Sequence, residues 1–525
     1  MNRDSNMSQP STRACASIFR FSLVAVAAAV MVGCASAPPQ ALSTQALKEA
    51  STLDAQALRK DVEPIAKPLT LDEAMARALK YNLDRRAKLM EEALALGQVD
   101  MSRYDMLPKV LAQAGYSWRD NDRITNSRDM VTGQPSTNRF VSQDRSHDMT
   151  ELGLTWSLLD VGLGYHGVTQ QQARYLIAGE KRRKAMHLLM QDVRTAYWRA
   201  ASAQVLRDDL RKTVALADEA LADARRSEQE RVRNPMESLR FQRQLQENLR
   251  LLEAIEQELL SAQVDLAGLI NAPVGQQITI AQTDLKNTAA EAVEVPLAKL
   301  EELALTQNAD LREQHYNARI AREEVKRTML RLFPNVTFNY GVKYDSDSYL
   351  VNQNWNEAGL QLSFNLMNLV TGSKQMQLAE AGVALADQRR MASHLSVLTQ
   401  VHLARLQLIH ARNQFDRADA IYSTDKKIAE LMRNRQAVQA QSKLDVVSNE
   451  SAAILSLLRR YQAFNQVQAA ENRLMATLGM EPQIGSTSEL SLQQLTTEIS
   501  QAGSPWKLIK DGAVKVQAPA KAVSR

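Results

Sequence analysis

The clearest pattern in this sequence is an alternation of apolar and polar residues in four short segments. In the third segment, Phe338, Tyr340 and Val342 alternate with Asn339 and Gly341. Successive side chains of a strand point to opposite faces, so each segment predicts a β-strand with one apolar and one polar face. The four strands are expected at about 109–118, 149–158, 335–345 and 358–366.

The segments between and after the strands have the spacing of helices. Apolar residues such as Val193, Ala196 and Ala200 recur every three or four positions, and no proline interrupts the chain from Gly164 to Arg231. Such a segment is roughly 100 Å long as a helix, and an average spacing of about 3.5 residues is typical of supercoiled helices. We expect long helices at about 163–231, 236–271, 372–435 and 442–478, and shorter helices at about 71–106 and 297–332.

The two halves of the chain repeat the same order of elements. Asn82 and Asn308 are 226 residues apart, and beyond the strands Gly164 and Gly372 are 208 residues apart. A fixed offset of this kind indicates an internal structural repeat, here a helix, a β-hairpin and two long antiparallel helices. We expect one repeat at 69–296 and the other at 297–500, with the change of offset placing a longer loop, about 119–147, in the first hairpin.

The first residues have the pattern of a bacterial secretion signal. Arg13 and Arg20 precede an apolar run that ends in Met-Val-Gly before Cys34, too short for a spanning helix. This ending resembles a lipobox, whose cysteine is acylated; the alternative is an ordinary signal peptide cut near Ala35 or Ala37. We expect a signal peptide at 1–33, a flexible tether at 34–68 with Cys34 as the lipid anchor, and a disordered tail at 501–525.

The composition argues against catalysis and nucleic-acid binding. The net charge is only +5, and no basic stripe with interleaved aromatic residues occurs. Of the seven histidines, His394, His402 and His410 follow one another at intervals of eight residues, whereas a helical metal pair is spaced by four. No catalytic residue, metal site or cofactor is therefore expected.

Strands with one apolar and one polar face fit a soluble sandwich or a transmembrane barrel. The strand length of about ten residues matches a bilayer crossing. Four strands cannot close a barrel, and open edges do not persist in lipid. Three copies would supply twelve strands, which is an allowed barrel with an open lumen. The predicted fold is mainly α with a membrane β-barrel, continued by an α-helical coiled-coil barrel.

Strand hairpins joined to helices of this length resemble the TolC family of outer-membrane channels, in particular its lipoprotein branch. The resemblance covers roughly residues 69–480. It is carried by the opening at 71–82, the strand-starting Pro108 and Pro334, the segment 156–162, the stretch from Arg435 to Val447 and the helix end at Leu478-Gly479.

The resemblance implies a homotrimer in the outer membrane that extends into the periplasm, where a periplasmic adaptor and an inner-membrane pump dock on the helical tips. The tips are expected near 231–237 and 435–445. Gln436 and Gln439 replace the Tyr and Gly that are usual in the family's tip pattern. The implied pore-constriction residues are Asp445 and Glu237, and the adaptor-contact candidates are Arg435, Gln439, Ser442 and Lys443, together with Arg433.

Three functions fit this pattern. The first is a passive exit duct for small-molecule efflux, driven by a partner pump. The second, in the same fold, is a duct for type I protein secretion. The third is a periplasmic coiled-coil scaffold without conduction. The sequence does not identify the transported substrate.

Overall fold

The computed structural model describes residues 41–230, 235–273, 275–276, 278–281, 292–437, 443–480, 490–501, 506 and 509. The chain divides into two units, Met1–Glu63 and Pro64–Arg525. The first unit contains one described helix, α2 (Thr44–Arg59), which Ser43 caps by accepting a hydrogen bond from the backbone of Ala46. Residues 44–59 of the predicted tether are thus helical, because their Ala, Leu, Gln and Lys residues favour a helix even where every residue is exposed.

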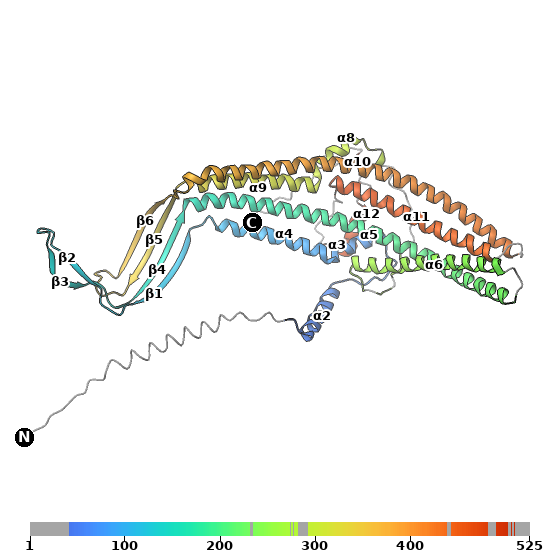
Figure 1. Cartoon of the computed structure of the whole chain (residues 1–525), viewed down its shortest axis with the longest axis horizontal. Helices are drawn as coiled ribbons and strands as arrows, with labels where there is room; N and C mark the ends of the chain where they lie inside the picture. Colours follow the sequence, from blue (N-terminus) through green and yellow to red (C-terminus); the bar gives the residue numbers. More distant parts are fainter. Residues whose placement is uncertain are drawn as a thin grey trace, which may run out of the picture. The chain divides into compact units, whose positions relative to one another are not determined.

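The second unit contains a four-stranded antiparallel sheet with the strand order β1-β4-β5-β6 (Figure 1). The strands are β1 (Lys109–Trp118), β4 (Ser146–Ser157), β5 (Asn335–Asp345) and β6 (Asn354–Ser363). The last strand begins a few residues before the predicted position. Because β4 of the first repeat pairs with β5 of the second, the two hairpins form one continuous sheet.

The loop of the first hairpin has structure that the sequence did not predict. It contains β2 (Ile124–Arg128) and β3 (Pro135–Val141), which pair with each other as a separate two-stranded ribbon. The equivalent loop of the second hairpin, between β5 and β6, contains no strand. The extra residues of the first repeat therefore form a defined element.

Two long helices continue from the sheet, α5 (Leu158–Gln229) after β4 and α10 (Asn368–Ala437) after β6, and each is followed by a second helix, α6 (Pro235–Leu269) or α11 (Lys443–Thr477). Helix α5 begins before its predicted start because the Ser157 hydroxyl accepts a hydrogen bond from the Asp160 backbone and caps it. Leu206 of α5 is fully buried in one cluster with Leu252 of α6 and Leu458 of α11. The apolar seam of α5 therefore packs against two helices.

The two shorter helices predicted from the sequence are each divided in two. The first repeat has α3 (Leu71–Tyr81) and α4 (Leu83–Tyr104), and the second has α8 (Leu297–Gln307) and α9 (Ala309–Arg331). The predictions of single helices over 71–106 and 297–332 are thus wrong at Asn82 and Asn308. Each asparagine ends one helix and caps the next, with its side-chain oxygen 3.0 Å from a backbone nitrogen.

These two asparagines also connect each helix break to a long helix. Asn82 Nδ2 donates to the carbonyl of Leu269 at 3.3 Å, and Asn308 Nδ2 donates to the carbonyl of Thr477 at 2.9 Å. The accepting carbonyls are the last residues of α6 and α11, which have no partner within their own helices. The internal repeat therefore preserves a structural link as well as an order of elements.

The C-terminal segment contributes to the core, contrary to the prediction that 501–525 is disordered. Helix α12 (Leu492–Gln501) packs against α3. Beyond it, Trp506 and Ile509 have no exposed surface, and the Trp506 indole donates to Glu471 Oε1 at 2.7 Å. The prediction is wrong at these positions because burying a large indole stabilises the folded chain, even though the polar, Pro-containing sequence around it favours disorder.

Gly479, which follows α11, has a backbone conformation and surroundings that require glycine. Its φ angle is +67°, and a Cβ atom there would lie 2.1 Å from the carbonyl oxygen of Gln307. We expect Gly479→Ala to lower the free energy of unfolding by at least about 2 kcal/mol. Asn271, the equivalent residue of the first repeat, has φ +53°; Asn271→Gly should leave the thermal unfolding midpoint almost unchanged. Similar midpoints for the two variants would contradict the backbone explanation.

Candidate conduction path and docking tips

One face of the sheet is apolar and exposed. Trp156, Phe338 and Leu360 lie directly opposite one another on β4, β5 and β6. Leu360 is 76% exposed, and Tyr340, at the centre of β5, is 40% exposed. An apolar surface of this kind on a single chain indicates contact with lipid or protein.

The opposite face carries charges that are paired across the strands. Glu151 of β4 lies opposite Lys343 of β5. Lys343 Nζ is 2.9 Å from Glu357 Oε2 and 3.7 Å from Glu151 Oε1. Because charged side chains need water or charged partners, this face is suited to an aqueous lumen.

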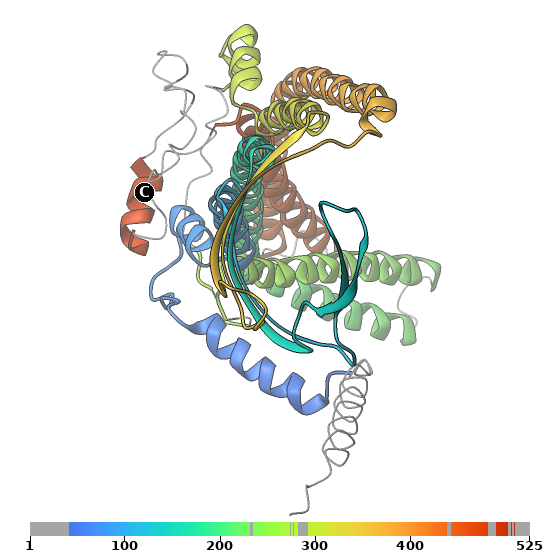
Figure 2. The ribbon, with the colours of Figure 1, turned by 90° about the vertical axis from the view of Figure 1, so that its left-hand side faces the viewer.

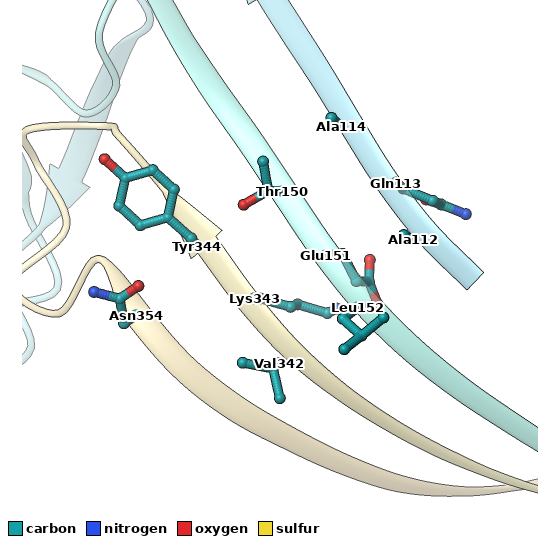
Figure 3. A pocket seen from close by; sticks show the side chains of 10 residues that line it. All are labelled: Ala112, Gln113, Ala114, Thr150, Glu151, Leu152, Val342, Lys343, Tyr344 and Asn354. Carbon is teal, nitrogen blue, oxygen red and sulfur yellow. Dashed lines mark ion pairs between the residues drawn. The ribbon is translucent and has the colours of Figure 1, made fainter. Parts of the chain in front are cut away.

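A hollow of about 470 Å³ lies on the sheet (Figure 3). Most of the residues that line it, such as Ala112, Leu152 and Val342, share the row positions of the apolar face, while Gln113, Glu151 and Lys343 occupy the row between them. The hollow is therefore bordered mainly by residues of the apolar face.

The sheet ends in two strands that each have one neighbour among the described residues. The strand order leaves β1 and β6 at the edges, and an unpaired edge presents a row of backbone donors and acceptors. Because β1 and β6 run antiparallel to each other in this order, the β6 edge of one copy can pair with the β1 edge of another in the same pattern. The sheet is thus a segment that more copies could close.

The helical tips lie at the other end of the second unit, where α5 turns into α6 and α10 turns into α11 (Figure 1). Arg435 is exposed in the last turn of α10. Asp445 is half-buried in the first turn of α11, and its carbonyl accepts a hydrogen bond from Asn449 Nδ2 at 2.6 Å. The structure thus brings one predicted pore residue and one predicted adaptor-contact residue to the same end.

The other predicted site residues are only partly described. The backbones of Glu237 and Lys443 lie in the first turns of α6 and α11. Gln439, Ser442 and Cys34 lie outside the described residues. Their predicted roles in the pore, in adaptor contact and as lipid anchor remain predictions.

Two ion pairs that the sequence did not predict join α10 and α11. Arg433 of α10, expected as an adaptor contact, lies 2.7 Å from Glu450 Oε1 of α11. Arg460 of α11 lies 2.5 Å from Asp419 of α10 and over the ring of Tyr422. An acidic residue on a long helix has no distinctive sequence signal, because its basic partner depends on which helix lies alongside.

Among the described residues, no helix combines the length and the apolar character that a membrane crossing requires.

Solved outer-membrane channels have the same fold. The chain is 12% identical to CmeC of Campylobacter jejuni, with a TM-score of 0.61 over 82% of this chain and 89% of that one. It is 13% identical to VceC of Vibrio cholerae, with a TM-score of 0.57 over 78% of this chain and 96% of that one. For MtrE of Neisseria gonorrhoeae in its open state, the identity is 15% and the TM-score 0.57, over 78% and 89%. The fold is therefore that of outer-membrane channel proteins.

Part of the chain matches the model of a known family. Residues 74–272 match the model of the Outer membrane efflux protein family, and no curated protein matches the chain. The resemblance to the TolC family that the sequence predicts is confirmed by this match, together with the shared fold.

Proposed function

We propose that three copies of this chain form the outer-membrane channel of a tripartite export system. In this proposal the channel is a passive exit duct for small molecules, and an inner-membrane pump connected through a periplasmic adaptor drives transport. The observation that carries it is the sheet with an exposed apolar face and a paired, charged opposite face, joined to helices of up to 72 residues. Lipid on one side and water on the other satisfy both faces.

The open edges of the sheet support the proposed trimer, because pairing between copies would remove them. Pairing of β6 with β1 of the next copy leaves no backbone group unpaired in the lipid. The long helices then continue the barrel as a helical tube. A lipid on Cys34 would add a second attachment to the same membrane.

At the periplasmic end, three Asp445 carboxylates would form a ring around the threefold axis, with Glu237 as a second candidate. Such a ring favours cations and binds multivalent ones. We expect Asp445→Asn to reduce cation preference in planar bilayers and to weaken block by a trivalent cation added on the tip side. Asp54→Asn, which removes the same charge from the exposed α2 helix, should change neither. Unchanged selectivity in Asp445→Asn would place the constriction elsewhere.

The docking partner is tested by photocrosslinking in cells. A photoreactive residue at Gln439 or Lys443 should capture the periplasmic adaptor of a drug pump, with Arg435 and Ser442 in the same contact. Capture of the adaptor of an ABC exporter would assign the duct to type I protein secretion instead. Capture of nothing but other copies of the chain would contradict docking at the tips and favour the scaffold.

A further inference from the structure

The β2–β3 ribbon has a preformed tip. Asp129 Oδ1 accepts hydrogen bonds from the backbone N–H groups of Thr132 and Val131, both at 2.8 Å. These hydrogen bonds lower the pKa of Asp129 below its usual value. Met130 is 100% exposed and Val131 is 94% exposed at this tip. The ribbon is therefore an ordered element with apolar residues at its end.

The ribbon lies beyond one end of the sheet, on the side towards which the sheet is concave (Figures 1 and 2). Figure 1 shows β2 and β3 beyond the ends of the strands that are remote from the long helices. In Figure 2, which looks along the molecule from that end, the sheet forms an arc and the ribbon stands within its concave side. When three such arcs close into a barrel, the concave side is the lumen. The ribbon then lies across the outer mouth.

Two sets of contacts fix the base of the ribbon. Arg145 forms a bidentate ion pair with Asp122, at 2.6 and 2.9 Å, across the two segments that lead into it. The Asp144 carboxylate accepts hydrogen bonds from the backbone and hydroxyl of Ser348 in the β5–β6 loop, at 2.6 and 2.9 Å. Asp144 and Arg145 follow β3, and Gln143 is the next residue towards the ribbon.

Gln143 is held by a histidine on the polar face of the sheet. His147, at the start of β4, is only 5% exposed. Its Nδ1 lies 2.7 Å from Asp345 Oδ1, and its Nε2 lies 2.9 Å from Gln143 Nε2. Gln143 in turn accepts a hydrogen bond through Oε1 from Arg123 Nη1 at 3.0 Å. Asp345, His147, Gln143 and Arg123 thus form one chain of contacts from the sheet to the ribbon.

This chain requires a neutral imidazole. Gln143 Nε2 is a donor, so His147 Nε2 must accept this hydrogen bond. The ring proton is then on His147 Nδ1, which donates a hydrogen bond to Asp345. Protonation of His147 turns Nε2 into a donor that faces another donor. Rotation of the Gln143 amide cannot restore the chain, because its NH₂ group would then face the guanidinium of Arg123. One link between sheet and ribbon is lost in either case.

Three carboxylates and one guanidinium lie around His147. The charged groups that face it are Asp345 on β5, Asp144 at the ribbon base and, through Gln143, Arg123. Asp347 of the β5–β6 loop accepts a hydrogen bond from the Asp144 backbone at 3.1 Å and adds a third carboxylate nearby. Histidine is also the side chain that ordinarily changes charge between pH 5 and 8.

We propose that the β2–β3 ribbon is a cap over the outer mouth of the channel, held closed by the contact of His147 with Gln143 and released when His147 takes up a proton. The inference rests on the proposed function, since the mouth exists only where three sheets close. It adds an outer gate that responds to the pH outside the cell.

The contact between His147 and Gln143, here called the latch, is tested without any measurement of conduction. Spin labels at Met130→Cys on the ribbon and Val351→Cys on the β5–β6 loop report the distance between them. The two native cysteines do not interfere, because Cys15 lies in the predicted signal peptide and Cys34 is the predicted lipid anchor. The wild-type latch should give a narrow distance distribution at pH 7.5 and a broader, longer one at pH 5.

Two variants separate the latch from general effects of acid. His147→Gln offers a donor and an acceptor but does not titrate, so its distribution should stay narrow at both pH values. Gln143→Leu leaves the buried His147–Asp345 pair intact and should give the broad distribution at both. A wild-type distribution that does not change between pH 7.5 and pH 5, or an acid response that persists in His147→Gln, would overturn the latch.

The cap is tested by conductance in planar bilayers. At pH 7.5, a chain in which a short turn replaces residues 124–141 should conduct several-fold better than the wild type. Acid on the ribbon side should raise wild-type conductance towards that level and leave His147→Gln low. Equal conductance of the wild type and the ribbon deletion at pH 7.5 would overturn the cap. If neither chain conducts, the proposed channel function fails, while the spin-label distances still decide the latch.

Discussion

Replacing Tyr340 by arginine will keep the chain from inserting into the outer membrane. Tyr340 lies at the centre of β5 on the apolar face, opposite Leu154 and Ala358. An arginine on the lipid face at the bilayer midplane costs about 2–4 kcal/mol, and a trimer carries this cost three times. Membrane fractionation should show that inserted protein falls to a small fraction of the wild-type amount.

The adjacent residue supplies a matched control. Asn339 lies opposite Thr155 and Gly359 on the polar face, so an arginine there would face water in the lumen. Asn339→Arg should insert normally. Equal insertion of the two variants would mean that the apolar face of the sheet does not face lipid.

Replacing Trp506 by alanine will strongly destabilise the chain although the residue lies near its end. Truncation of a fully buried aromatic side chain typically costs about 3–5 kcal/mol. The change also removes the indole donor to the buried Glu471 carboxylate, which adds a desolvation cost. The thermal unfolding midpoint of the purified protein should fall clearly.

Two further variants divide this effect into its parts. Trp506→Phe keeps most of the ring but loses the hydrogen bond, and should cost about 1–3 kcal/mol. A chain that ends after residue 501 should lose at least as much stability as Trp506→Ala. An unfolding midpoint of that shortened chain equal to that of the full chain would contradict a structural role for Trp506.

Much of the architecture could be predicted because it rests on periodicity. A period of two over about ten residues specifies a strand with two unlike faces. The offset between Asn82 and Asn308 then predicts that two copies of one arrangement occur. Neither inference depends on contacts between distant residues, and both give the elements seen in the structure.

The features that the sequence did not predict depend on distant partners. Asn82 and Asn308 divide helices because each accepts a backbone hydrogen bond and also reaches a long helix. Trp506 lies in a polar stretch of sequence, and only its contact with Glu471 in the folded chain makes it a core residue. His147 gave no signal, because its partners Asp345 and Gln143 meet it only after the two hairpins form one sheet.

The candidate site was predictable only in part. Asp445 and Arg435 could be chosen because a resemblance gave their positions, and the structure places both at one end of the helices. The ion pair between Arg433 and Glu450 could not be chosen, since charged residues recur all along both helices. Which side chains face the lumen depends on the assembly and not on one chain.

The assembly is therefore the most direct test of the account. Electron cryomicroscopy of the full chain in lipid nanodiscs should show three copies around a threefold axis. The β6 strand of each copy should pair with β1 of the next, with Tyr340 towards lipid and Lys343 towards the lumen. Single chains outside the lipid, or a sheet whose apolar face packs on protein, would contradict the account.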